Sequence, residues 1–369
     1  MSWPKVRLGD VCEVKAGRDY KDVESPDGKY PIYGTGGVMG MSREWRCPAG
    51  SVIVGRKGTL DNPMLINEPF WNIDTCFGVV PSDKLLPAYL WRFCQNFDFY
   101  SLVPASGRPS TTSDAVKAIK LPLPPLAEQK KIVEKVEKAL KRVDALKAQF
   151  ERMEKSAADY FKAALAETFA AVKGEKVKLG DVSSFMTSGS RGWAQYYADD
   201  GEMFITIKNV RGGEIDVGNV QHVHPPSGAE TERTRVQEND LLISITADLG
   251  RTGVVTKEIA AAGAYINQHL ICIRLYRDRV DPRFAALYIE SPDGRAQIMH
   301  RNKEAVKAGL NFDRVKTIEL PIPSLEIQRE VVKRLTEIKC TASRLEEAAR
   351  RCIGICGKMR KAILAEAFQ

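Results

Sequence analysis

The strongest constraint on the fold is an internal repeat, because three short motifs occur twice in the same order along the 369 residues. The copies are VRLGDV at 6–11 and VKLGDV at 177–182, IKLPLPPLAEQ at 119–129 and IELPIPSLEIQ at 318–328, and AALAETF at 163–169 and AILAEAF at 362–368. The first pair is separated by 171 residues and the other two pairs by 199. The chain is therefore a variable block followed by a segment of fixed length, written twice, with 28 more residues in the second variable block.

Both fixed segments have the pattern of a long helix. Prolines precede the first segment, and no proline occurs from 126 to 173. Apolar or small residues recur in it at alternating steps of four and three, which is the heptad pattern of a coiled coil. The predicted seam residues are Ile132, Val136, Val143, Leu146, Phe150 and Met153 in the first helix, and Val331, Leu335, Ile338, Leu345, Met359 and Ile363 in the second.

We expect the two helices to pair with each other in antiparallel orientation, because equivalent units in one chain are most simply related by a pseudo-two-fold axis. Aligning the seams centre to centre places Met153 opposite Ala342 and Leu146 opposite Ala349, so that large residues meet small ones. A helix over 129–169 is ~60 Å long at ~1.5 Å per residue, the length of ~18 base pairs of duplex DNA. The helices are thus expected to hold two domains apart.

The variable blocks combine strand and helix patterns and predict α/β domains. Runs such as SVIVGR at 51–56 and LICIRL at 270–275 are typical of buried strands, and Pro87 and Pro282 each open a predicted helix. The expected fold class is α+β, with two α/β domains separated by two long helices that form an antiparallel intramolecular coiled coil. The predicted segments are 1–120 for the first α/β domain, 121–173 for its helix, 174–317 for the second α/β domain and 318–369 for the second helix.

A glycine-rich stretch, YGTGGVMG at 33–40, raises the question of a phosphate-binding loop. Its glycines do not have the G-x-G-x-x-G or P-loop spacing, and residues 41–50 lack the helical period that should follow such a loop. We interpret the stretch as a tight turn that lets the backbone pass close to DNA or to the sheet, with glycines that serve conformation.

Composition narrows the class of protein further. No apolar run approaches the length of a membrane span, and the first ten residues have no apolar signal core, so we expect a cytoplasmic protein without a membrane partner. Eight cysteines without a C-x-x-C pair and only four histidines predict a reduced chain that binds no metal. The net charge of +8 permits nucleic-acid binding, although it is not gathered in a basic tail.

In these motifs the chain resembles the specificity subunits of type I restriction–modification systems. The resemblance covers essentially the whole chain and rests on the L-G-D opening, the I-x-L-P-x-P-x-L-x-E-Q motif and the long helix that ends in L-x-E-x-F, all repeated once. Further motifs similar to target recognition domains of that family are YPIYGTGGVMG at 30–40, GRKGT at 55–59 and WNIDT at 71–75 in the first block, and SGSRGWAQ at 188–195 and YINQH at 265–269 in the second. One departure is Ile327, which stands where Glu128 stands in the first copy.

The resemblance implies a non-catalytic subunit that reads a bipartite, asymmetric DNA target, with one half-site for each α/β block and the helices setting the spacer. Its implied partners are double-stranded DNA, two methyltransferase subunits and restriction subunits, and the isolated chain is expected to self-associate through its docking surface. No cofactor is expected on this chain itself. S-adenosylmethionine belongs on the methyltransferase, and ATP and Mg²⁺ belong on the restriction subunit.

The candidate DNA contacts are polar and basic residues on predicted loops, because such side chains suit phosphates and base edges. They are Arg18, Arg43, Arg56, Lys57, Arg108, Ser110 and Thr111 in the first block, and Ser190, Arg191, Lys208, Arg211, Arg251, Gln268, Lys303 and Asn311 in the second.

Three other functions are compatible with parts of the sequence. The chain fits a reader in a related assembly that is not of type I. It fits a structural coiled-coil adaptor, although two long, unlike α/β blocks exceed what that role needs. It also fits an enzyme that uses the glycine-rich loop. Against an enzyme, the chain has no D/N/S-P-P-Y/F/W methylation motif, no F-x-G-x-G cofactor loop and no Walker lysine loop.

Overall fold

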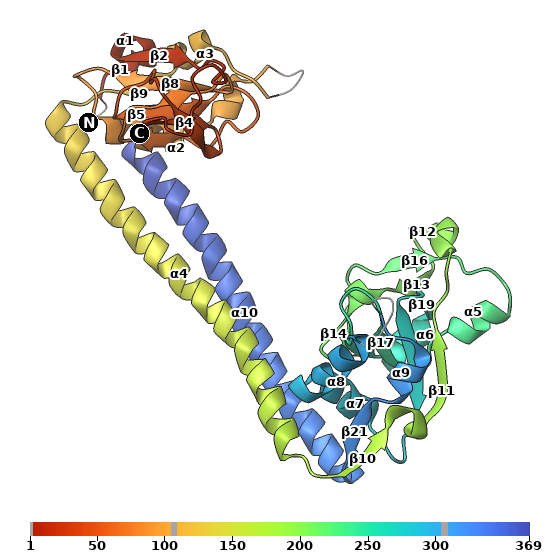
Figure 1. The fold of residues 1–369 in the computed structure, drawn as a ribbon. Coiled ribbons are helices and arrows are strands. Elements are labelled where there is room, and N and C mark those ends of the chain that lie inside the picture. The colour runs from red at the N-terminus through yellow and green to blue at the C-terminus, as the bar shows by residue number, and fades with distance from the viewer. Residues whose placement is uncertain (1–2, 105–108, 304–308) are drawn as a thin grey trace. The chain divides into compact units, whose positions relative to one another are not determined.

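The computed structural model describes residues 3–104, 109–303 and 309–369. Contacts divide the chain into two compact units, one made of Met1–Arg152 with Ala349–Gln369 and the other of Met153–Ala348. The two longest elements are α4 (Leu126–Ala171) and α10 (Leu325–Ala367), and each contributes one end to each unit (Figure 1). Each unit is therefore an α/β block together with parts of both helices.

The first unit is built on a four-stranded antiparallel sheet in the order β2-β8-β5-β6, with a three-stranded sheet β4-β3-β7 and a two-stranded ribbon β1-β9. Its elements are β1 (Lys5–Arg7), α1 (Leu8–Val11), β2 (Cys12–Ala16), β3 (Tyr30–Gly34), β4 (Gly37–Ser42), β5 (Ser51–Gly55), β6 (Met64–Ile66), β7 (Trp71–Asn72), β8 (Cys76–Pro81), α2 (Pro87–Asn96), η1 (Phe99–Leu102), α3 (Ser113–Ala118) and β9 (Lys120–Pro122). Strand β5 is buried along its whole length, as its uninterrupted apolar run predicts.

The second unit repeats this plan with a four-stranded sheet β11-β20-β17-β18, a second sheet β12-β16-β13-β19, a ribbon β10-β21 and an added hairpin β14-β15. Its strands are β10 (Glu175–Lys178), β11 (Ser183–Ser188), β12 (Tyr197–Ala198), β13 (Glu202–Ile205), β14 (Val210–Arg211), β15 (Glu214–Ile215), β16 (Gln221–Val223), β17 (Leu241–Ser244), β18 (Thr252–Val254), β19 (Ala264–Ile266), β20 (Leu270–Leu275) and β21 (Glu319–Ile322). Its helices are η2 (Leu179–Val182), η3 (Trp193–Tyr196), η4 (Ile207–Asn209), α5 (Ala229–Thr234), α6 (Lys257–Ala262), α7 (Pro282–Glu290), α8 (Pro292–Lys303) and α9 (Phe312–Lys316).

The repeated L-G-D motif has the same role in both units. Its leucine is buried and donates its backbone N–H to the carbonyl at the start of the proline motif, at 2.7 Å for Leu8 to Ile119 and 2.7 Å for Leu179 to Ile318. The strand before the motif pairs antiparallel with the strand of the proline motif in each unit. The two motifs therefore recur together because each closes the block onto the start of its helix.

The glutamine that ends each proline motif is fully buried and joins the helix to the loop before α2 or α7. Gln129 Oε1 accepts from Leu86 N at 2.8 Å, and its Nε2 donates to the carbonyls of Lys84 at 2.9 Å and Pro124 at 2.8 Å. Gln328 makes the matching three bonds, to Asp281 N at 2.8 Å and to the carbonyls of Arg279 and Pro323 at 2.9 Å each. Each amide thus satisfies three backbone groups that burial would otherwise leave unpaired.

The repeated L-x-E-x-F motif brings each helix end onto the block of the other copy. Phe169, near the end of α4, packs edge-on against Phe284 and Tyr288 of α7, with ring centroids 5.4 and 5.3 Å away. Phe368, just beyond α10, packs in the same way against Tyr89 and Phe93 of α2, at 5.1 and 5.6 Å. This exchange of helix ends explains why each unit contains parts of both helices.

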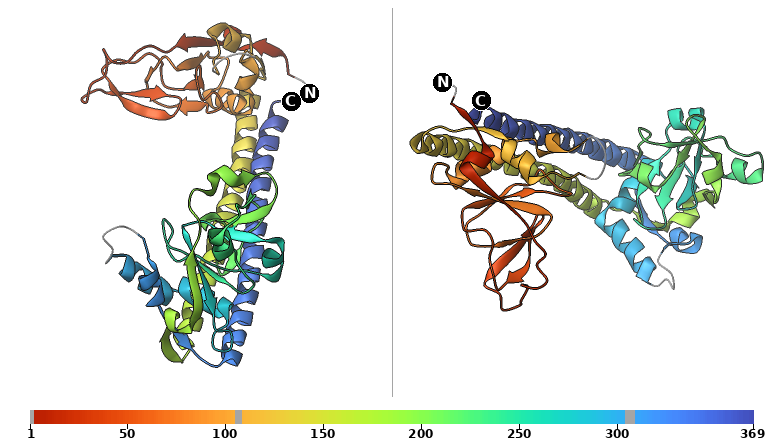
Figure 2. Two further views of the ribbon diagram at one scale, coloured as in Figure 1. Left: turned by 90° about the vertical axis from the view of Figure 1, so that its right-hand side faces the viewer. Right: turned by 90° about the horizontal axis from the view of Figure 1, so that it is seen from above.

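The helices α4 and α10 run antiparallel and lie side by side (Figure 1 and Figure 2), as the pseudo-two-fold repeat predicts. In the first unit Val136 and Leu140 pack against Leu364, and Asp144 forms an ion pair with Arg360 at 2.9 Å. In the second unit Ala164, Leu165, Val331 and Leu335 belong to one core cluster.

The axial alignment predicted from the seams is wrong. It sets Asp144 opposite Arg351, whereas Asp144 pairs with Arg360. Heptad spacing defines which face of each helix is apolar and leaves the offset along the axis open, so matching large residues with small ones gave a false register. Of the predicted seam residues, Val136, Val143, Val331 and Leu335 are buried and Ile132, Phe150, Met153, Ile338 and Ile363 are half-buried, whereas Leu146, Leu345 and Met359 are each 42% exposed.

Candidate nucleic-acid interface

In both units the loops that carry candidate DNA contacts meet at one edge of the four-stranded sheet. In the first unit β2 and β5 end where β8 begins, because Ala16 lies opposite Phe77 and Gly55 opposite Cys76. In the second unit β11 and β17 end where β20 begins. The antiparallel strand order therefore gathers three loops at the same edge of each sheet, which we call the strand-end edge.

A glycine after the first strand lets these loops cross closely in both units. An added Cβ at Gly17 would lie 1.8 Å from the carbonyl oxygen of Ile73, and one at Gly189 would lie 2.1 Å from that of Ile266. The next residue donates its N–H across the crossing, from Arg18 to Asn72 at 3.1 Å and from Ser190 to Ile266 at 3.0 Å. Only glycine fits such a backbone approach, and the residue after it is held at the edge.

The first strand-end edge brings together four of the predicted contact residues. Arg56 follows β5, and its carbonyl accepts from Thr111 N at 2.9 Å, while Lys57 forms a β-bridge with Ser110. Asp74 orients the two cations, since Lys57 Nζ lies 3.2 Å from Asp74 Oδ2 and Arg56 Nη1 donates to the Asp74 carbonyl at 3.2 Å. Lys57 and Ser110 are exposed, whereas Thr111 is 5% exposed.

Arg18 belongs to a second, aromatic part of the same unit. A cavity of about 500 Å³ is lined by Arg18, Trp45, Arg46 and Trp71, among others, and Trp45 is 47% exposed. The guanidinium of Arg46 lies 5.2 Å from the Trp71 ring centroid and donates to the Ala16 carbonyl at 3.0 Å. Burial, and then the nearby charge of Arg18, lower the pKa of Arg46. Arg43 is exposed at the base of the β3–β4 hairpin, two residues before Trp45.

The second strand-end edge has different side chains on the same backbone plan. Gln268 donates its N–H to the Ser190 carbonyl at 3.0 Å, and its side chain contacts His269 Nε2 at 3.0 Å. His269 Nδ1 in turn lies 2.8 Å from Thr246 Oγ1, which follows β17. Ser190 itself is buried and bonded to the Thr234 hydroxyl at 3.1 Å, so it supports the loop, whereas the neighbouring Arg191 is exposed.

The remaining predicted contacts fall in several places. Arg251 lies in the β17–β18 turn and is paired with Asp248. Asn311 caps helix α9, accepting from Arg314 N at 3.0 Å, as Thr112 caps α3 in the first unit. Lys208 and Arg211 are exposed beside the β14–β15 hairpin, which contacts α10 through Lys339, so the structure does not gather them with Ser190 and Gln268. Arg108 and the side chain of Lys303 lie outside the described residues.

Several side chains near these edges are not among the contacts predicted from residue type and loop position. Thr246 and His269 complete a polar cluster with Gln268, and the YINQH motif was the available signal for His269. Trp45 and the hairpin residues Val38 and Met39 are exposed apolar side chains, which a search for polar residues passes over. No group of three or more His, Cys, Asp or Glu residues within the described ranges is arranged to hold a metal ion.

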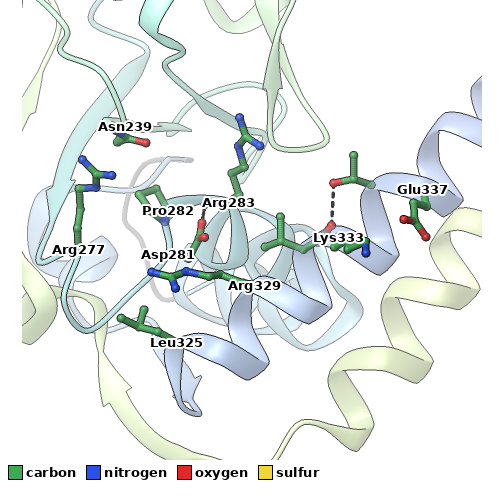
Figure 3. Close-up of a pocket in the computed structure, with 11 residues that line it drawn as sticks. Asn239, Arg277, Asp281, Pro282, Arg283, Leu325, Arg329, Lys333 and Glu337 are labelled. Atoms are coloured by element: carbon green, nitrogen blue, oxygen red, sulfur yellow. Dashed lines mark hydrogen bonds between the residues drawn. The ribbon is translucent and has the colours of Figure 1, made fainter.

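A separate, basic cavity of about 610 Å³ lies in the second unit at the other end of β17, near Asn239. Figure 3 shows Arg277, Arg283, Arg329 and Lys333 around it, contributed by the loop before α7, by α7 and by the first turns of α10. Among the described residues no ion pair within 4.0 Å engages these four cations. By the matching glutamine bonds and helix starts, Arg283, Arg329 and Lys333 correspond to Ala88, Lys130 and Glu134 in the first unit. We call this cavity the α7–α10 pocket.

A duplicated α/β block whose two helices exchange ends, with unlike polar loops on matching sheet edges, defines a two-site binding protein. The sequence profile of the type I restriction modification DNA specificity domain matches residues 2–155 and 172–350, and the chain belongs to this family.

Individual relatives agree with this membership. The chain is 25% identical to the type I restriction enzyme EcoBI specificity subunit of Escherichia coli over 419 residues, covering 100% of this chain and 86% of the relative. It resembles in fold a solved chain from a study of complex assembly and conformational transition of the type I R-M system, with a TM-score of 0.78, 21% identity and coverage of 100% and 98%. The HsdS subunit from Thermoanaerobacter tengcongensis is also similar, with a TM-score of 0.57, 23% identity and coverage of 100% and 96%.

No helix in the described ranges combines the length and the apolar character that a membrane crossing requires.

Proposed function

We propose that this chain is the DNA-reading subunit of a type I restriction–modification complex, with each strand-end edge binding one half of a bipartite target. The observation that carries the proposal is that two blocks share one backbone frame and present different side chains at the same edge. Arg56 and Lys57 in the first unit are suited to guanine edges and phosphates, and Gln268 in the second is suited to adenine. Two unlike readers on one chain recognise an asymmetric target.

Catalysis in this proposal belongs to partner subunits. Arginine, lysine, glutamine and hydroxyl groups donate hydrogen bonds to phosphates and base edges, which positions DNA without reacting with it. Two methyltransferase subunits would supply S-adenosylmethionine and methylate adenine, and restriction subunits would supply ATP and Mg²⁺. The net charge of +8 is modest, so the partners would contribute part of the DNA affinity.

The long helices would set the unread spacer between the half-sites. Helix α4 has 46 residues and α10 has 43, and each is continuous. At ~1.5 Å per residue they are ~65–70 Å long, so their length is sufficient to define a gap of several base pairs. Removing one heptad from both helices at equivalent positions would shorten the gap of the recognised target and leave both half-sites unchanged.

The α7–α10 pocket supports docking of an acidic segment of a partner protein. It lies at the end of β17 away from the strand-end edge. Its four cations, which form no ion pair within the described part of the chain, outnumber the lining carboxylates Asp281 and Glu337 and therefore favour an acidic ligand. The matching position in the first unit carries Ala88 in place of Arg283 and Glu134 in place of Lys333, so the two methyltransferase subunits would be held with unequal strength.

The docking proposal predicts that R283E/R329E lowers the methyltransferase-to-specificity subunit ratio from two towards one, measured by native mass spectrometry of the purified complex. The matched control, A88E/K130E, adds a negative charge at Ala88 and reverses the charge at Lys130, the equivalent positions of the first unit. It should keep the ratio at two. Loss of both subunits in each variant, or of neither, would contradict unequal docking.

The test of the DNA-reading function is methylation mapping. The chain is co-expressed with the methyltransferase subunit with which it co-purifies, and modified adenines are located genome-wide by single-molecule sequencing. The proposal predicts a new bipartite motif with a fixed gap that is absent when this chain is omitted. Co-purification without any new motif would overturn it.

A further inference from the structure

The β3–β4 hairpin of the first unit ends in two exposed apolar side chains. Val38 is 58% exposed and Met39 is 53% exposed, and both follow the turn that joins the strands. Scattered apolar residues are common on protein surfaces, but two adjacent ones at the tip of a ribbon form a small apolar knob. In the second unit residues 206–220 intervene between the equivalent strands β13 and β16, so this hairpin tip belongs to the first copy alone.

Contacts place the tip at the first strand-end edge. Ile73 donates its N–H to the Tyr33 carbonyl at 3.1 Å, and the next residue, Asp74, orients Arg56 and Lys57. From the other side, Asn62 Nδ2 donates to the Thr35 carbonyl at 2.9 Å. The hairpin tip is thus fixed to the loops that carry the candidate DNA contacts.

The two glycines of the turn leave the tip narrow, and only one of them is required by the fold. Gly37 has φ +117°, a backbone conformation that side chains rarely adopt. Gly36 has no such conformation, and a Cβ added there meets no atom within 4 Å. The space beside Gly36 is therefore open, which suits the close approach of another molecule.

We propose that this tip enters the major groove of the first half-site and that Val38 and Met39 contact the C5-methyl group of a thymine. A two-stranded β-ribbon fits the major groove, and the thymine methyl is the apolar group that a base edge presents there. The inference rests on the proposed DNA-reading function. It adds an apolar contact to the polar contacts of Arg56 and Lys57, and it requires an A·T pair in the first half-site.

The experiment measures binding of the complex with its methyltransferase to duplexes that carry the mapped target. Each thymine of the first half-site is replaced in turn by deoxyuridine, which removes the methyl group alone. One replacement should weaken binding by about three- to fivefold, the effect of exposing one buried methyl group. The polar variant V38T/M39Q should bind the unmodified target more weakly and lose the response to that replacement. The apolar control V38I/M39L should keep the response.

A second variant, Gly36→Ala, tests the close approach without changing the apolar pair. It should weaken binding to the target and leave the melting temperature unchanged. The inference is overturned if the wild-type complex binds its target specifically but is indifferent to every deoxyuridine, or if the mapped first half-site has no A·T pair. Wild-type binding that does not distinguish the target from unrelated DNA would instead overturn the proposed function itself.

Discussion

The two repeat units differ least where they are buried and most where they reach solvent at the strand-end edge. Gln129 and Gln328 make the same three hydrogen bonds, and Phe169 and Phe368 make the same edge-on aromatic contacts on the opposite block. At the matching edges, a Lys–Asp pair beside Arg56 in one unit corresponds to a Gln–His–Thr cluster in the other.

This contrast separates residues that maintain the frame from residues that read a ligand. The frame must satisfy buried backbone groups and fill a core, and few side chains meet both requirements at one position. Exposed side chains at the edges, such as Lys57 and Arg191, satisfy no such requirement in the fold, so their identities are free to match different half-sites. The comparison predicts equal effects for matched frame substitutions and unequal effects for matched edge substitutions.

The largest expected effect is on the aromatic contacts at the helix ends. Phe368→Ala and Phe169→Ala should each destabilise by about 3–5 kcal/mol, because each removes a buried ring and leaves a cavity. Hydrogen exchange should show faster opening of α2 for Phe368→Ala and of α7 for Phe169→Ala. Phe→Leu at either position should cost less. Faster opening only in the first block for Phe169→Ala, or only in the second block for Phe368→Ala, would contradict the exchange of helix ends.

The next effect is on the buried glutamines. Gln129→Leu and Gln328→Leu each leave one backbone N–H and two carbonyls without their partner, at a cost of about 1–3 kcal/mol. Chemical denaturation of each variant measures this loss, with the exposed neighbour Lys130→Leu as a control of little effect. Clearly different losses for the two glutamines would show that the units do not depend on this contact in the same way.

At the strand-end edges the effects should become specific to one half-site. Arg56→Ala should weaken discrimination in the first half-site by about 1–3 kcal/mol, and Gln268→Ala should do so in the second only. Competition binding with targets altered in one half measures both. An equal loss on unrelated sequences would identify Arg56 as a phosphate contact.

The smallest effect concerns the helices. Gly354 and Gly357 lie within α10, and an added Cβ meets no atom within 4 Å at either, whereas α4 has Lys155 and Ala158 at the equivalent positions. Gly354→Ala should therefore stabilise the protein by about 0.5–1 kcal/mol, measured as a rise in melting temperature. A fall would indicate that this position of α10 needs the flexibility of glycine.

The sequence predicted the frame well because the frame is local and repeated. The heptads identified both helices and their apolar faces, and the proline motif contained Gln129 and Gln328. Periodicity carries no information on axial offset, so the alignment of Asp144 with Arg351 was wrong.

The edges were only partly predictable, because their contacts join residues distant in sequence. Thr111 reaches Arg56, and Leu310 reaches Ile245, through backbone hydrogen bonds that depend on the closed sheet. The selection of polar loop residues included the buried Ser190, which supports its loop, and passed over Thr246, which completes the polar cluster. The selection also included Lys208, which is basic and exposed but lies beside the β14–β15 hairpin and is not gathered with Ser190 and Gln268.

The central claim is that each unit reads one half-site independently on a shared frame. The most direct test replaces residues 1–120 with the corresponding block of a family member that has a different target, and repeats the methylation mapping. Independent reading predicts a new first half-site with the second half-site and the gap unchanged. A change in both halves, or loss of methylation in a complex that still assembles, would contradict independent reading.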